Sequence, residues 1–176
     1  RQRNIAILEE EAMSGTAGNA AHHKYQTALE LLLTGNLQDG TEGLVQVLDE
    51  TVPESAFRPS AGLHACEGFL AQGRVGDAYA TATRLLNEYP GFLEVGELVA
   101  GALLDRGLTA EAGLLIAAAT KKAARKDLPK SEGADSYRLH YTLSRLSLGN
   151  GQKDAALSYV MSALKAKPDF APAQIL

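Results

Sequence analysis

The feature of this 176-residue chain that most limits its fold is an internal repeat with a period of 34 residues. Gly73 and Gly107 are 34 residues apart, and so are Ala78 and Ala112. Each period contains two helical patterns of apolar residues separated by the glycine, and a proline closes the period at Pro90. A repeat of this length predicts helical hairpins that bury their apolar faces against the next hairpin along the chain.

Two further copies of the pattern flank this pair. Their turn glycines, Gly35 and Gly151, stand one period plus four residues before Gly73 and one period plus ten residues after Gly107. The ten extra residues fall in 127–135, which is rich in turn formers and predicts an enlarged loop. The four predicted units are 21–54, 59–92, 93–126 and 137–170.

Equivalent positions of the four units carry residues suited to tight helix packing. A small side chain at the eighth position allows the first helix to approach its partner closely, and a leucine follows four residues later. The turn glycine supplies the left-handed backbone that ends the first helix. The small residues are Ala28, Cys66, Ala100 and Ser144; the leucines are Leu32, Leu70, Leu104 and Leu148; the second helix carries Gly40, Ala78, Ala112 and Ala156 where it meets the first.

This set of spacings resembles the tetratricopeptide-repeat (TPR) family, whose period is 34 residues. The resemblance covers residues 21–170 and implies an all-α fold, a right-handed superhelical solenoid of antiparallel helix pairs. In such arrays the first helix of each pair lines a concave groove. The sequence departs from the family at the fourth position of each unit, where an aromatic residue is typical and Lys24, Gly62, Gly96 and His140 stand.

The two ends of the chain extend beyond the repeats. Residues 1–13 read as an extra N-terminal helix, and 14–19 as a flexible break within a 1–20 helix-and-loop segment. Residues 171–176 read as the start of a capping or further helix. We therefore expect one TPR-like domain over 1–176. Because the chain begins with Arg1 and ends on apolar residues, we expect it to be a fragment of a longer protein.

The residues give no sign of catalytic or cofactor chemistry. The net charge of −4 argues against a nucleic-acid binder, and no apolar stretch approaches the roughly 20 residues that span a bilayer. The histidines do not combine with Cys66 at metal-ligand spacing, and Gly149–Lys153 lacks the spacing of a phosphate-binding loop. We therefore expect no enzyme activity, no cofactor, no metal and no membrane insertion by this segment.

The resemblance implies that a protein or peptide partner binds in the concave groove. It places an apolar end in the first unit, acidic residues in the middle and two arginines in the last unit, which favours a partner segment with matching apolar and charged groups. A clamp for a chaperone's terminal carboxylate is not expected, because the family's lysine and asparagine are absent. The groove residues carried over are Tyr25, Leu29, Leu63, Glu67, Glu97, Asp105, Arg138, Tyr141 and Arg145.

The function that these features predict is a non-catalytic scaffold or adaptor in the assembly of a bacterial multiprotein complex, in the cell envelope or in export. A periplasmic or envelope-associated location is favoured by the expected loss of an N-terminal anchor. Two alternatives remain: a cytoplasmic chaperone-like binder of secreted substrates, and the regulatory arm of a larger enzyme. Self-association through the terminal helices is also possible.

Overall fold

The computed structural model describes residues 17–123 and 127–175, and every regular element within these ranges is an α-helix. The chain divides in sequence between Glu88 and Tyr89 into two compact units, and each is described by itself. The first unit contains α2 (Ala17–Leu33), α3 (Leu37–Glu50), α4 (Arg58–Ala71) and α5 (Val75–Glu88). The second contains α6 (Leu93–Leu104), α7 (Thr109–Thr120), α8 (Tyr137–Gly149), α9 (Lys153–Ala166) and α10 (Ala171–Gln174).

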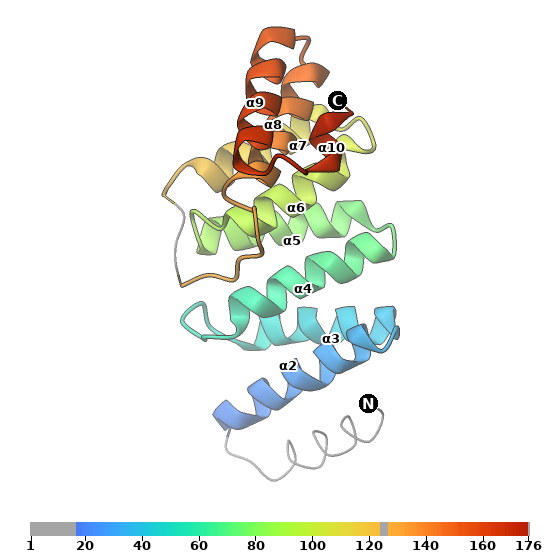
Figure 1. Cartoon of the computed structure of the whole chain (residues 1–176). Coiled ribbons are helices and arrows are strands. Elements are labelled where there is room, and N and C mark those ends of the chain that lie inside the picture. The colour runs from blue at the N-terminus through green and yellow to red at the C-terminus, as the bar shows by residue number, and fades with distance from the viewer. Residues whose placement is uncertain (1–16, 124–126, 176) are drawn as a thin grey trace. The chain divides into compact units, whose positions relative to one another are not determined.

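Within each unit, consecutive helices form hairpins of a first helix (helix A) and a second (helix B). The hairpins are α2–α3 and α4–α5 in the first unit, and α6–α7 and α8–α9 in the second (Figure 1). This arrangement confirms the prediction of paired helices in each repeat.

All four hairpins turn in the same way. The φ angles of the turn glycines lie between 73° and 91° at Gly35, Gly73, Gly107 and Gly151. This conformation is unfavourable for any residue that carries a side chain. Each glycine N–H donates to the carbonyl of the repeated leucine three residues earlier, at 2.9–3.1 Å. The next N–H donates to the carbonyl five residues before it, at 2.8–3.0 Å. This pair of bonds satisfies carbonyls that the end of helix A leaves open.

Small residues bring helix A and helix B together. The side chains at the eighth position are buried in all four repeats, and so are Ala78, Ala112 and Ala156 in the B helices. In the first repeat the helix B position is Gly40, where an added Cβ would lie only 2.5 Å from the backbone nitrogen of Leu32. The first hairpin is therefore packed so closely that even alanine does not fit there.

The glycines at the fourth position have the same role in two repeats. A Cβ on Gly62 would lie 2.6 Å from the Leu85 side chain, and one on Gly96 would lie 2.4 Å from the Cβ of Ala119. Both contacts join helix A to helix B of one repeat. Glycine replaces the family's aromatic residue here because the two helices approach too closely for a larger side chain.

A buried arginine stabilises the first unit. Arg58, at the start of α4, donates to the carbonyls of Leu48 and Thr51 at the end of α3, and forms a bidentate ion pair with Glu88 at 2.8 and 2.9 Å. Carbonyls at a helix C-terminus lack partners within the helix, and a cation there is favourable. One side chain therefore joins the ends of α3 and α5 to the beginning of α4.

The chain ends agree with the sequence in part. The expected N-terminal helix over 1–13 lies outside the described residues. The expected break over 14–19 is wrong for its last three residues, because α2 already begins at Ala17. A sequence pattern locates the end of a helix only to within one or two residues. The loop expected over 127–135 is irregular, and α10 lies where a further helix was expected to start.

Candidate binding surfaces

Rings from α2, α4 and the segment between α3 and α4 meet in the first unit. The Tyr25 ring stacks on Phe57 with centroids 5.7 Å apart, and lies nearly parallel to the His64 ring at 6.5 Å. His22 meets the edge of Phe57 at 5.4 Å. Such offset and edge contacts are favourable for aromatic pairs. Together these residues form an aromatic cluster on the helix A side of the first unit, defined by His22, Tyr25, Phe57 and His64.

A carboxylate lies beside the aromatic cluster. A carboxylate oxygen of Glu67 lies 2.8 Å from Nδ1 of His64, one helical turn away on α4. The side chain of Glu67 is 46% exposed. Burial raises the pKa of Tyr25, with the charge of Glu67 acting in the same direction. The first unit therefore presents half-buried rings next to an exposed negative charge, which is an arrangement that attracts a cation.

The second unit joins its two A helices by ion pairs. Arg138 on α8 donates to Glu97 and to Glu94 on α6, the latter at 3.4 Å. Glu97 also accepts a hydrogen bond from the Thr142 hydroxyl at 3.1 Å. Burial raises the pKa of Glu97, although Arg138 and Thr142 act against this rise. The positive charge of Arg138 is therefore already compensated within the unit.

The enlarged loop is hydrogen-bonded to one of these acids, Glu94. Glu94 accepts hydrogen bonds from the backbone N–H and the hydroxyl of Ser131, both at 2.8 Å, and Arg138 donates to that hydroxyl. Within the loop, Lys130 pairs with Asp135 at 2.6 Å. The ten-residue insertion is therefore held against α6 by a buried carboxylate.

A second, more exposed ion pair joins the C-terminal ends of α6 and α8. Arg145 donates to Asp105 at 2.6 Å, and its guanidinium lies 5.7 Å from the centre of the Tyr141 ring. Tyr141 also meets the edge of Phe170 at 5.5 Å. Arg145, Tyr141 and Asp105 are thus side by side, with Asp105 the most exposed of the three.

Comparison with known proteins identifies the fold. No family model and no curated protein matches this sequence. The solved structure of YrrB, described as a TPR protein with an unusual peptide-binding site, matches with a TM-score of 0.70 at 12% identity, covering 99% of this chain and 81% of that one. A putative kinesin light chain from Podosopora anserina with nearly identical TPR-like repeats matches with a TM-score of 0.64 at 20% identity, covering 96% and 89%. This chain has a TPR fold.

MamA from Desulfovibrio magneticus RS-1 also matches, with a TM-score of 0.68 at 13% identity, covering 87% of this chain and 78% of that one. The all-α fold predicted from the repeat is therefore confirmed. At identities this low the likeness concerns the fold alone.

The TPR groove positions predicted from the sequence divide into two groups. Leu63 and Glu97 are each only 7% exposed, so they pack within their units and offer little surface to a partner. Arg138 is paired with two acids, and its side chain keeps 25% of its surface exposed. The positions that keep accessible surface are Tyr25, Leu29, Glu67, Asp105, Arg138, Tyr141 and Arg145. Their binding role stays a prediction.

The described residues offer no metal-binding group, no reactive thiol and no membrane-spanning helix. No group of three or more His, Cys, Asp or Glu residues among them is arranged to hold a metal ion. The thiol of Cys66 is fully buried, and burial raises its pKa to about 12, so it stays protonated and unreactive. Over the same residues, no helix is long and apolar enough to cross a membrane.

Proposed function

We propose that this TPR chain is a non-catalytic scaffold that binds a segment of another protein on the A helices. The observation that carries the proposal is the aromatic cluster beside the exposed Glu67 in the first unit. Half-buried rings recognise an apolar or planar side chain, and a carboxylate at their edge favours a cationic one. The preferred partner segment therefore carries an arginine or lysine next to an apolar anchor.

The accessible groups of the second unit support a polar contact with the same kind of partner. Asp105 can accept hydrogen bonds from a partner, while the ring of Tyr141 offers apolar area. Arg145 is held by Asp105 in the free protein, so a partner carboxylate would have to exchange with that pair. This competition makes the second unit a weaker site for an acidic group than the two arginines alone would suggest.

The biological setting that we propose is the assembly of a bacterial multiprotein complex, in the cell envelope or in export. The TPR fold supports a binding role. A second support is that YrrB, which shares this fold, is described as having a peptide-binding site of its own. A chaperone-like binder of secreted substrates and the regulatory arm of a larger enzyme use the same surface and remain alternatives.

The test uses a random peptide library displayed on phage, because the partner is not identified. Peptides selected on the whole chain are expected to be rich in arginine or lysine beside leucine or aromatic residues. Their affinity is then measured for the wild type, for Glu67→Lys and for Asp77→Lys. Asp77 is the matched control, because it lies on helix B and pairs with Arg74 at the same spacing at which Glu67 pairs with His64.

We expect Glu67→Lys to weaken binding about tenfold or more, which corresponds to about 1.4 kcal/mol. Asp77→Lys should change the affinity by no more than about twofold, because a charge away from the binding site contributes little to the affinity. Equal losses in the two variants would show that net charge, and not the aromatic cluster, controls binding. Selection of no peptide at all would remove the support for a peptide site on this chain.

A further inference from the structure

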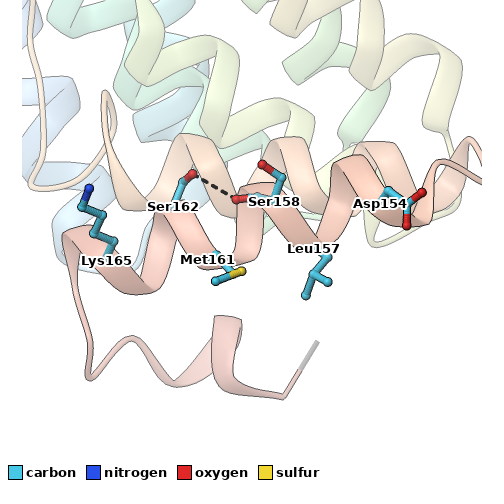
Figure 2. A pocket seen from close by; sticks show the side chains of 6 residues that line it. All are labelled: Asp154, Leu157, Ser158, Met161, Ser162 and Lys165. Carbon is cyan, nitrogen blue, oxygen red and sulfur yellow. Dashed lines mark hydrogen bonds between the residues drawn. The ribbon is translucent and has the colours of Figure 1, made fainter.

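Helix α9 presents an apolar strip that its own unit leaves uncovered. Leu157 and Met161 are 61% and 64% exposed, and they project from the same side of the helix in Figure 2. They line a shallow hollow together with Ser158 and Ser162 and with charged side chains towards the two ends of the helix. Two exposed large apolar residues one turn apart form a contact face rather than scattered surface positions.

The other repeats show what normally covers this face. Leu157 directly follows Ala156, the small residue of helix B, so its equivalents are Thr41 in the first repeat and Gly113 in the third. Thr41 is fully buried, and Gln72, which caps the C-terminal end of the next helix A, donates to its hydroxyl at 2.9 Å. A Cβ at Gly113 would lie 3.7 Å from Leu146 of the next helix A. In these two repeats the position of Leu157 therefore faces the next helix A, whereas Leu157 itself is exposed on α9.

The charges at the ends of the strip indicate which helix fits. Asp154 lies one turn before Leu157, and Lys165 lies one turn after Met161. In an antiparallel pair of α9 helices related by a two-fold axis, Asp154 of each copy faces Lys165 of the other, while Leu157 of each faces Met161 of the other. The two pairings require registers that differ by one residue, which is about 1.5 Å along the helix. A parallel pair would place like charges together.

We propose that this face binds a second copy of the chain, with the two α9 helices packed antiparallel around a two-fold axis. Such an interface is isologous, so the same residues contribute from both copies and the contact closes at the dimer. The four-residue helix α10 contacts α9, and in Figure 2 it lies on the side of α9 towards which Leu157 and Met161 project, so it borders this interface. A single helix pair buries less than the roughly 1,200 Å² of a standard interface, so the dimer is weak and concentration-dependent.

The test is sedimentation velocity of the whole chain from about 1 to about 500 µM, a range chosen for a weak interface. The wild type is expected to shift from monomer to dimer. Leu157→Lys/Met161→Lys should stay monomeric, since it places four like charges in the contact. Leu114→Lys, on α7, is the matched control, because Leu114 is also 64% exposed and is expected to leave the dimer intact.

Charge exchange tests the orientation. Asp154→Lys alone and Lys165→Asp alone should each weaken the dimer about fivefold or more, and the double variant Asp154→Lys/Lys165→Asp should restore it. All four positions are exposed, so the variants should fold, and circular dichroism verifies this. The proposal is overturned if the wild type is monomeric throughout, if the double lysine variant still dimerises, or if the charge-exchanged variant fails to recover.

Discussion

Replacing Arg138 with methionine tests whether the second unit depends on its ion pairs. The variant keeps an unbranched apolar stem but leaves Glu97 and Glu94 without their cation. Breaking a buried pair by removing one partner costs about 3–5 kcal/mol. Because the Arg138 side chain is a quarter exposed and Glu94 keeps its bonds from Ser131, we expect the lower end, about 3 kcal/mol at pH 7.5.

The loss should depend on pH in a defined direction. Burial raises the pKa of Glu97 in the folded protein above its ordinary value of about 4.3. A raised folded pKa means that this carboxyl favours folding below the unfolded value, and that its contribution is lost as pH rises through the folded value. Removing Arg138 removes an attraction for the ionised form, so the variant should be impaired most at pH 7.5 and clearly less at pH 4.5.

The assay is urea unfolding followed by circular dichroism, with hydrogen exchange of the α6 and α8 amides to locate the effect in the second unit. With a slope of about 1.5 kcal/mol per molar urea, the midpoint of that transition should fall by about 2 M at pH 7.5. Lys24→Met is the control, because Lys24 forms a single exposed ion pair with Glu50 and should change the midpoint little. Equal shifts in the two variants, or an undiminished shift at pH 4.5, would refute the reasoning.

Three further predictions concern packing and burial. Arg58→Met should lower the free energy of unfolding by about 3 kcal/mol at pH 7. Because Arg58 holds the pKa of Glu88 below its usual range, this loss of stability should shrink as pH falls through the folded pKa of Glu88. Urea titrations at pH 7 and pH 3.5 would show the difference. Gly40→Ala should destabilise by about 2 kcal/mol through overpacking, whereas Gly76→Ala, where a Cβ meets nothing within 4 Å, should stabilise by up to about 1 kcal/mol in thermal unfolding. Cys66 should not react with a thiol reagent until urea unfolds the protein, and rapid reaction of the folded chain would contradict its burial.

The repeat made the helical pairs predictable from the sequence. The turn glycines end helix A locally, and the small residues at the eighth position pack against the adjacent helix. Their regular spacing alone therefore identified both. The conformations of Gly35 and Gly151 confirm this for the outer copies, whose spacing was irregular. The limit of α2 was less predictable, because glycine and serine near a helix start are compatible with either a loop or a first turn.

Contacts between helices of successive repeats were not predicted. Arg58 lay in an irregular join, and nothing in its neighbourhood marks it as buried. Glu97 and Arg138 were both assigned to the groove, because they stand at the fifth and second positions of their units, which the TPR resemblance places in the groove. A signal was nevertheless present: opposite charges stand at the fifth and second positions of successive units, and again where Asp105 and Arg145 stand. Charge complementarity between neighbouring repeats would have found both pairs.

The two ion pairs between α6 and α8 limit how freely this array can be rearranged. Glu97 and Asp105 are eight residues apart, and their partners Arg138 and Arg145 are seven apart, so both pairs hold only in one register of the two helices. A last repeat moved onto a different neighbour would carry two arginines with no acids to meet them. For module exchange or consensus design, residues 93–170 of this chain are therefore a single interchangeable piece, and its two repeats are not separate ones.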